Sequence, residues 1–220
     1  MEDIIFKEVL FNAMRWFKLL KDKMGWKRKK RPLTDPETDL KNKLSYAVAA
    51  IQIQCKRLDL AINKLKEKDR YYYLRILNAL RLHDKKKAII YANELSEVRK
   101  ALKSVNFVKL ALEQIAVRLL TLKDIATVVK QLSPAIKIIN SVKKEIAGVL
   151  PQAEEELSSL SDQLTRILVD ASQMENFAVD LTTTDLEAEK ILSQAEEQVE
   201  RELKEKLPPI PSFSKEALKT

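Results

Sequence analysis

Apolar or small side chains recur between Leu44 and Leu65 at alternating steps of four and three residues. This spacing places them along one side of an α-helix and is typical of a helix that packs lengthwise against another helix. Asp69 interrupts the seam, which resumes at Tyr72. The pattern therefore predicts one long helix that has a lengthwise partner. The seam residues are Leu44, Val48, Ile51, Cys55, Leu58, Ile62 and Leu65, then Tyr72, Ile76 and Ala79.

The partner helix is predicted directly downstream. The polar stretch at residues 83–87 is long enough to reverse the chain, and a second seam runs from Tyr91 to Leu119. We therefore expect a hairpin of two helices, one from about Asp39 to Leu82 and one that continues to about Gln131. A parallel row widens the apolar face of the second helix and leaves apolar surface for another contact. This row consists of Ala101, Val108, Ile115, Leu122 and Val129.

The composition supports an all-α fold class. Only 2 of the 220 residues are Gly, and the chain combines 33% charged with 45% hydrophobic residues, which is typical of long helices rather than of disorder. The single cysteine, Cys55, lies on a seam position and cannot form an internal disulfide, so we interpret it as a core residue in a reducing compartment. No run reaches the ~20 apolar residues of a membrane span, and no secretory signal is recognised. The protein is predicted to be cytoplasmic.

Charge divides the chain into two parts. Residues 1–150 hold 33 Lys and Arg against 16 Asp and Glu, a net charge of +17. Residues 151–220 hold 7 against 16, a net charge of −9. Opposite charges attract, so the acidic part is expected to fold onto the basic part.

The first segment, residues 1–31, has the composition of an amphipathic helix that lies on a membrane. Large apolar side chains recur at helical spacing, both tryptophans lie here, and a polybasic run follows. Each Lys or Arg near an anionic surface contributes on the order of 1 kcal/mol to binding. The alternative is a helix that caps the core, followed by a solvated linker. The predicted membrane-binding residues are Phe6, Phe11, Trp16, Phe17, Leu20, Trp26, Lys27, Arg28, Lys29, Lys30 and Arg31.

Further boundaries follow from capping and proline signals. Residues 32–38 are a linker, and residues 39–150 are predicted to hold the hairpin and a short third helix that starts at Ser133-Pro134. Gly148 and Pro151 end that helix. Residues 151–206 are predicted to form two acidic helices, at about 152–177 and from Thr184 to about 206; Thr184 and Glu187 have capping-box spacing.

The last segment, residues 207–220, begins with Leu207-Pro208-Pro209-Ile210-Pro211. This run predicts an extended polyproline helix, a preformed ligand for a hydrophobic groove. The alternative is a stiff tail without a partner.

We find no signature of catalysis, a metal or a cofactor. His83 is the only histidine and belongs to the predicted turn, and no Glu-x-x-His pairs mark a bundle metal site. The basic tip at Arg81 and Lys85–Lys87 is a solvated turn or a contact for phosphate head groups. We expect no enzyme activity.

In organisation, residues 39–211 resemble ESCRT-III proteins, specifically the archaeal cell-division (CdvB-type) branch. The resemblance depends on the long helix, the charged turn at residues 83–87, the following segment at residues 88–100, the Pro134 helix, the acidic helices and the proline-rich run. Leu207, Pro208, Ile210 and Pro211 match the MIT-interacting motif that family members present to the MIT domain of an AAA+ ATPase.

The resemblance implies a non-enzymatic subunit that polymerises with itself and with paralogous subunits on an anionic membrane surface at the division site. Surface apolar residues of the second hairpin helix are expected to join subunits, the acidic region to hold the monomer closed, and the ATPase to recycle the polymer. A basic helical nucleic-acid-binding protein is the alternative. We expect no nucleic acid partner, because no groove-reading module is recognised and the acidic part would compete with phosphate.

Overall fold

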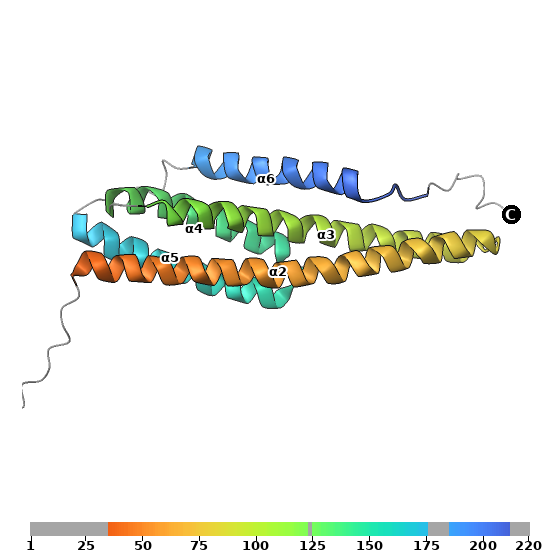
Figure 1. The fold of residues 1–220 in the computed structure, drawn as a ribbon, viewed down its shortest axis with the longest axis horizontal. Helices are drawn as coiled ribbons and strands as arrows, with labels where there is room; N and C mark the ends of the chain where they lie inside the picture. The colour runs from red at the N-terminus through yellow and green to blue at the C-terminus, as the bar shows by residue number, and fades with distance from the viewer. Residues whose placement is uncertain (1–34, 123–124, 176–184, 212–220) are drawn as a thin grey trace, which may run out of the picture. The chain divides into compact units, whose positions relative to one another are not determined.

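The computed structural model describes residues 35–122, 125–175 and 185–211, and in these ranges all regular structure is helical. From Leu40 onward the chain forms one compact unit. The all-α class is therefore confirmed. The described helices are α2 (Pro36–Arg81), α3 (Lys85–Leu120), α4 (Ile125–Ile146), α5 (Pro151–Glu175) and α6 (Asp185–Lys206), drawn in Figure 1.

The predicted hairpin is present as α2 and α3, which run antiparallel (Figure 1). His83 adopts a positive φ of 55° at the turn, and the Asp84 side chain accepts a hydrogen bond from the Lys87 backbone N–H at 3.1 Å, which caps α3. His83 is thus a turn residue, as predicted. Two ion pairs join the helices: Asp69 with Arg99 and Asp59 with Lys109, each at 2.6 Å.

The boundary predicted between the second and third helices is wrong. α3 ends at Leu120, where the Thr121 hydroxyl and backbone N–H both donate to the Arg118 carbonyl, and α4 begins at Ile125 and continues through Pro134. A proline inside a helix costs about 3 kcal/mol or more. Each large buried side chain of α4 contributes about 1.5–3 kcal/mol, and these outweigh the cost. They are Val128, Leu132, Ile138, Ile139, Val142 and Ile146.

The main core lies among α2, α3, α4 and α5, toward the end of the hairpin away from the turn, and α6 adds Ala188 and Ile191 to it. The row that was expected to leave apolar surface on α3 is largely consumed here, since Val108 and Ile115 are buried in this core. Cys55 is also buried, and burial raises the pKa of its thiol to about 11, which confirms it as a core residue. Exposed apolar side chains remain on several helices, among them Ile90, Val117 and Leu120 of α3 as well as residues of α2.

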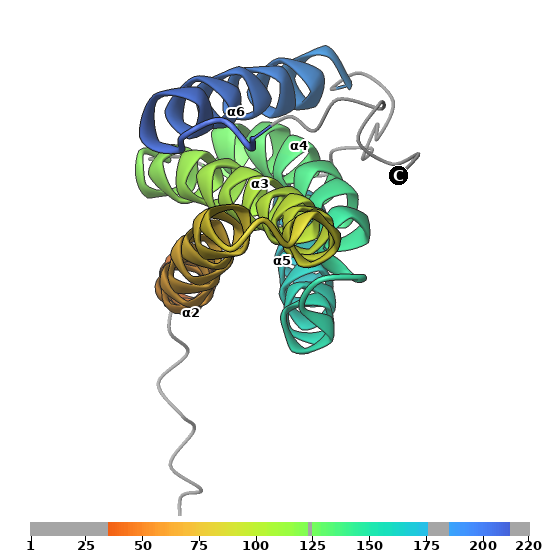
Figure 2. The ribbon, with the colours of Figure 1, turned by 90° about the vertical axis from the view of Figure 1, so that its right-hand side faces the viewer.

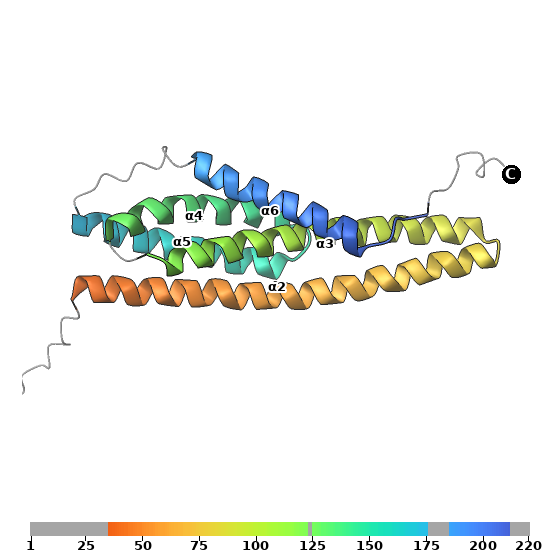
Figure 3. The same cartoon turned by 45° about the horizontal axis from the view of Figure 1, so that its top comes forward.

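α6 lies along α3, on the side opposite α2 (Figures 2 and 3). It runs antiparallel to α3, because Arg118 near the end of α3 pairs with Glu187, whereas Lys103 pairs with Glu200 near the end of α6. The acidic helix therefore covers the basic hairpin, as the charge division predicts. None of the described helices has the length and apolarity that a membrane crossing requires.

Candidate functional site

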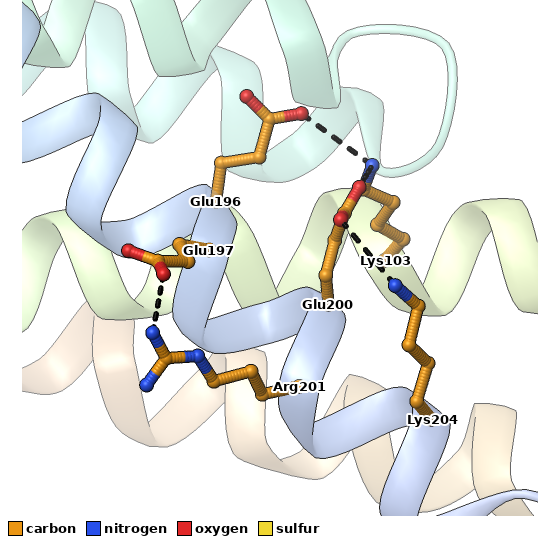
Figure 4. Close-up of polar contacts among 6 residues, drawn as sticks. All are labelled: Lys103, Glu196, Glu197, Glu200, Arg201 and Lys204. Carbon is orange, nitrogen blue, oxygen red and sulfur yellow. Dashed lines mark hydrogen bonds and ion pairs between the residues drawn. The ribbon is translucent and has the colours of Figure 1, made fainter.

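The contact between α6 and α3 is partly electrostatic. Lys103 Nζ lies 2.9 Å from a Glu200 carboxylate oxygen and 3.4 Å from one of Glu196 (Figure 4). Lys204 approaches the other oxygen of Glu200 at 4.0 Å, and Arg201 pairs with Glu197 within α6. Lys103 thus joins α3 to α6 near the end of α6, as Arg118 does through Glu187 near its start.

This contact shifts the pKa of both partners in the directions that a stabilising pair requires. The hydrogen bond to Glu200 raises the pKa of Lys103, and the same bond lowers the pKa of Glu200. Both groups are substantially exposed, so the pair is sensitive to salt.

Apolar burial supplies the other part of the contact. Ile191 and Val199 of α6 are 1% exposed, and Ala195 is fully buried. Fully buried Ile and Val side chains stabilise by about 1.5–3 kcal/mol each, which exceeds the usual contribution of exposed ion pairs. The acidic helix is therefore held mainly by its apolar face, and the ion pairs set its register.

Beyond α6 the chain continues along the hairpin in extended form. Leu207 is half-buried and packs against the main core, and Ile210 packs against a second, smaller cluster of Ile76, Ala92 and Leu95. Between them, Arg99 Nη1 donates a hydrogen bond of 2.7 Å to the Pro208 carbonyl. The segment that was predicted to bind an MIT domain thus contacts the hairpin of its own chain.

The outward face of α2 carries a stripe of exposed apolar side chains. Tyr46, Ile53, Leu60 and Leu74 are 77%, 51%, 63% and 55% exposed and lie seven residues, or twice seven, apart. Exposed Glu67 occupies the heptad position between Leu60 and Leu74, so the row is uninterrupted from Tyr46 to Leu60. We call these four residues the α2 stripe.

Basic side chains border the α2 stripe. Lys56, Lys64 and Arg70 are exposed and lie three or four residues from its members. Leu60 also lines a groove of about 570 Å³ between α2 and the start of α5, which is lined as well by Lys64, Lys68 and the ion pair of Arg57 with Glu156. The outward face of α2 therefore combines apolar and positively charged surface, which an acidic amphipathic partner would complement.

The structure describes only some of the predicted site residues. Phe6, Phe11, Trp16, Phe17, Leu20, Trp26 and Lys27–Arg31 lie outside the described residues. Of the predicted ATPase-binding residues, Leu207, Ile210 and Pro211 are half-buried and Pro208 is exposed. In the described ranges no three His, Cys, Asp or Glu side chains gather as metal ligands would.

Sequence reasoning missed the role of Asp69 and Arg99. Asp69 was interpreted only as an interruption of the seam. A signal was present: a carboxylate at a seam position needs a cation, and Arg99 lies as far after Asp84 as Asp69 lies before it. In an antiparallel hairpin such positions face each other, and Asp59 and Lys109 obey the same rule.

Comparison with known proteins gives two similar proteins of Sulfolobus acidocaldarius. The chain is 32% identical to Cell division protein B1 over 173 residues, which are 79% of this chain and 81% of that protein. It is 28% identical to Cell division protein B over 172 residues, 76% of this chain and 66% of that protein. No family model matches the chain, and no solved structure matches it.

Proposed function

The chain belongs to the cell division protein B (CdvB) family of archaeal ESCRT-III proteins, and on this premise we propose that it is a polymer-forming subunit that remodels a membrane during cell division. The described residues form the long hairpin and covering helices that such a subunit needs. The proposal has three parts: self-assembly, membrane contact through residues 1–31, and recruitment of an AAA+ ATPase through residues 207–211.

The α2 stripe is the observation that carries self-assembly. Its heptad spacing matches a long helical partner, and its basic border requires that partner to be acidic. A second copy of the chain offers exposed acidic side chains on two separate helices, Glu155 and Asp162 on α5 and Glu189 on α6. The interface expected on the second hairpin helix stays a prediction, since α3 also exposes Ile90, Val117 and Leu120; we favour α2 because its exposed apolar side chains have heptad spacing.

The charge pattern also determines what kind of assembly forms. If two α2 stripes faced each other, Lys56, Lys64 and Arg70 of both copies would repel. A contact between the α2 stripe of one copy and the acidic surface of the next uses two different surfaces. Contacts of this head-to-tail kind extend into open filaments when they do not close into a ring. Paralogous subunits with similar surfaces would join the same polymer.

Substitution on the two hairpin helices tests self-assembly. Ile53→Asp with Leu60→Asp adds charge to exposed positions, so the fold should persist while assembly on anionic vesicles, measured by electron microscopy and sedimentation, falls at least about tenfold. Val117→Asp is the matched control, since Val117 is 62% exposed on α3. If Val117→Asp abolishes assembly and the α2 pair does not, the α2 stripe is not the interface.

Deletion of residues 1–31 tests the membrane part. We expect pelleting with anionic vesicles to fall at least about tenfold at matched salt, because the aromatic and polybasic residues are lost. A gel shift with DNA under the same conditions addresses the alternative function. Unchanged pelleting would refute the docking role, and tighter binding to DNA than to vesicles would favour the nucleic-acid hypothesis.

A further inference from the structure

A groove lies between α2 and the start of α5. Lys43 of α2 pairs with Asp170 near the end of α5. Arg57 pairs with Glu156 near the start of α5, so the two helices run antiparallel. The groove has a volume of about 570 Å³ and follows α2 over residues 54–68. We call it the α2–α5 groove.

The floor of the α2–α5 groove is apolar. Leu60, Ala61 and Leu65 line it from α2. Val149 and Leu150 line it from the connection between α4 and α5. All of these except Leu60 are half-buried and pack against the main core, which holds the floor in place. Ligand sites are typically clefts of about 300–1,000 Å³ with an apolar lining and a few polar groups, so the groove has the size and lining of a site for one small molecule.

The net charge of the α2–α5 groove is located at one end. Arg57 is paired with Glu156, so these two charges cancel. Lys64 and Lys68 lie one helical turn apart and are exposed, and among the described residues neither has an ion-pair partner. The remaining side chains of the lining are uncharged. The groove therefore carries a net charge of +2 at its end nearer the hairpin turn.

This charge distribution suits a ligand with one anionic end. An acidic amphipathic helix carries carboxylates on successive turns, and some of these would lie beside Glu156, where like charges repel. A molecule with a single anionic head avoids this repulsion, because its head can lie at Lys64 and Lys68 while an apolar body covers the floor. From residue 54 to residue 64, α2 rises about 15 Å at 1.5 Å per residue, which is the length of an extended dodecyl chain.

We infer that the α2–α5 groove binds one dissolved single-chain amphiphile with an anionic head, such as an alkyl phosphate or a fatty acid. Lys64 and Lys68 hold the head through charge-assisted hydrogen bonds, and burial of the hydrocarbon chain supplies most of the affinity. The site goes beyond the proposed function, since it uses neither residues 1–31 nor a lipid surface. Of its lining, only Leu60 also belongs to the α2 stripe.

Calorimetric titration of the full chain with dodecyl phosphate, below the concentration at which it forms micelles, tests the site. We expect a saturable site for one molecule per chain. Its affinity should rise about two- to fourfold per methylene from octyl to dodecyl phosphate and then level off, because longer chains extend past the floor. Neutral dodecyl maltoside should bind at least about tenfold more weakly. Absence of a saturable site, or equal affinity for the neutral amphiphile, would overturn the inference.

Substitution of the two lysines identifies the contact with the head. Lys64→Gln with Lys68→Gln should weaken binding of dodecyl phosphate at least about tenfold and leave binding of dodecyl maltoside unchanged, since only the anionic head loses its partners. Lys56→Gln with Arg70→Gln is the matched control, because both residues are exposed on α2 and neither lines the groove. An equal loss in both double variants would show that overall charge attracts the amphiphile, and it would contradict the assignment.

Filling the floor identifies the contact with the hydrocarbon chain. Ala61→Phe keeps every charge but occupies the groove, and we expect binding of dodecyl phosphate to fall at least about tenfold. Ala49→Phe is the control, since Ala49 is exposed on α2 and lies outside the groove. Circular dichroism checks the fold, and Leu60→Gln replaces Ala61→Phe if that variant unfolds.

The same variant reveals a different occupant of the groove. If Ala61→Phe binds dodecyl phosphate as tightly as wild type but no longer assembles in sedimentation, the groove receives a second copy of the chain. If it binds the amphiphile but no longer pellets with anionic vesicles, the groove contacts a lipid surface. Either result would overturn the inference, and so would unchanged binding without any other effect.

Discussion

The two halves of the hairpin are built differently. In the proximal half (residues 40–65 and 101–120), α2 and α3 pack with α4 and α5 in one large apolar core. In the distal half (residues 66–100), the cluster of Ile76, Ala92 and Leu95 is small, and no described residue of α4 or α5 contributes to it. A shielded ion pair and the extended tail complete the distal half.

This difference assigns different tasks to the two halves. A large apolar core is stable and has little reason to open, so the proximal half serves as a scaffold. The distal half has few buried apolar side chains, and it gains contacts from the extended segment that carries Pro208 and Ile210. Regions of this kind are where proteins change their contacts. Regulation is therefore expected at the distal end and assembly along the scaffold.

The largest contrast should appear in the reactivity of Cys55, which lies in the proximal half. Burial raises the pKa of this thiol to about 11, and the core excludes reagents. We expect iodoacetamide to modify Cys55 at pH 8 at least about 1,000-fold more slowly than a cysteine introduced at exposed Ala49, since modification requires unfolding that costs about 5 kcal/mol or more. Comparable rates, measured by mass spectrometry, would show that the proximal core opens readily.

Truncation in the two clusters should affect different parts of the molecule. Leu112→Ala in the proximal core is expected to lower the free energy of unfolding by about 2–5 kcal/mol, because it leaves a cavity in a fully buried site. Ile76→Ala should mainly reduce hydrogen-exchange protection in residues 66–100. Chemical denaturation and hydrogen exchange measure the two effects. A uniform loss of protection in both variants would mean that the halves are one cooperative unit.

Breaking the shielded ion pair of Asp69 with Arg99 should destabilise the distal half more than breaking an exposed ion pair does. Asp69→Ala leaves Arg99 largely buried without its carboxylate, and we expect a loss of about 3 kcal/mol in unfolding free energy or in local protection. Asp69→Leu with Arg99→Met should recover most of it, because neither charge remains. Lys100→Ala, at an exposed pair, should cost less than about 1 kcal/mol. If Asp69→Ala were as stable as wild type, the shielded ion pair would contribute no more than an exposed one.

The smallest effect is expected from the Lys103–Glu200 ion pair, one of those that join α6 to α3. The pKa of Glu200 is lowered from 4.5, so its contribution is present above pH 4.5 and is lost as the pH falls through the lowered value. The pKa of Lys103 is raised from 10.5, so its contribution is present below pH 10.5 and is lost as the pH rises through the raised value. Hydrogen exchange of α6 should therefore increase modestly at pH 3 and at high salt. Glu189→Gln is the control. If hydrogen exchange of α6 in Lys103→Met increases at pH 3 as much as in wild type, the Lys103–Glu200 pair is excluded as the cause.

Much of this architecture could be predicted from local pattern. The seam from Leu44 to Leu65, the turn at His83 and the acidic composition of α6 are properties of neighbouring residues, and each predicts a helix, a turn or a charged surface directly. The N-terminal residues such as Trp16 and Arg28 stay a prediction, since they lie outside the described residues.

The proline signal shows where local pattern was insufficient. Ser133-Pro134 has the form of a helix start, yet α4 continues through it because its side chains on both sides of Pro134 are buried against other helices. The proline costs about 3 kcal/mol locally, and the burial of side chains in the packed structure outweighs this cost.

The sequence by itself determined the helices, the two seams and the division of charge, because periodicity and composition act within a few turns of chain. Only the tertiary structure decided that Asp69 would hold Arg99, that Arg99 would hold the tail, and that the exposed stripe would lie on α2. These outcomes depend on which surfaces meet, and that choice follows from the summed burial of many side chains distant in sequence.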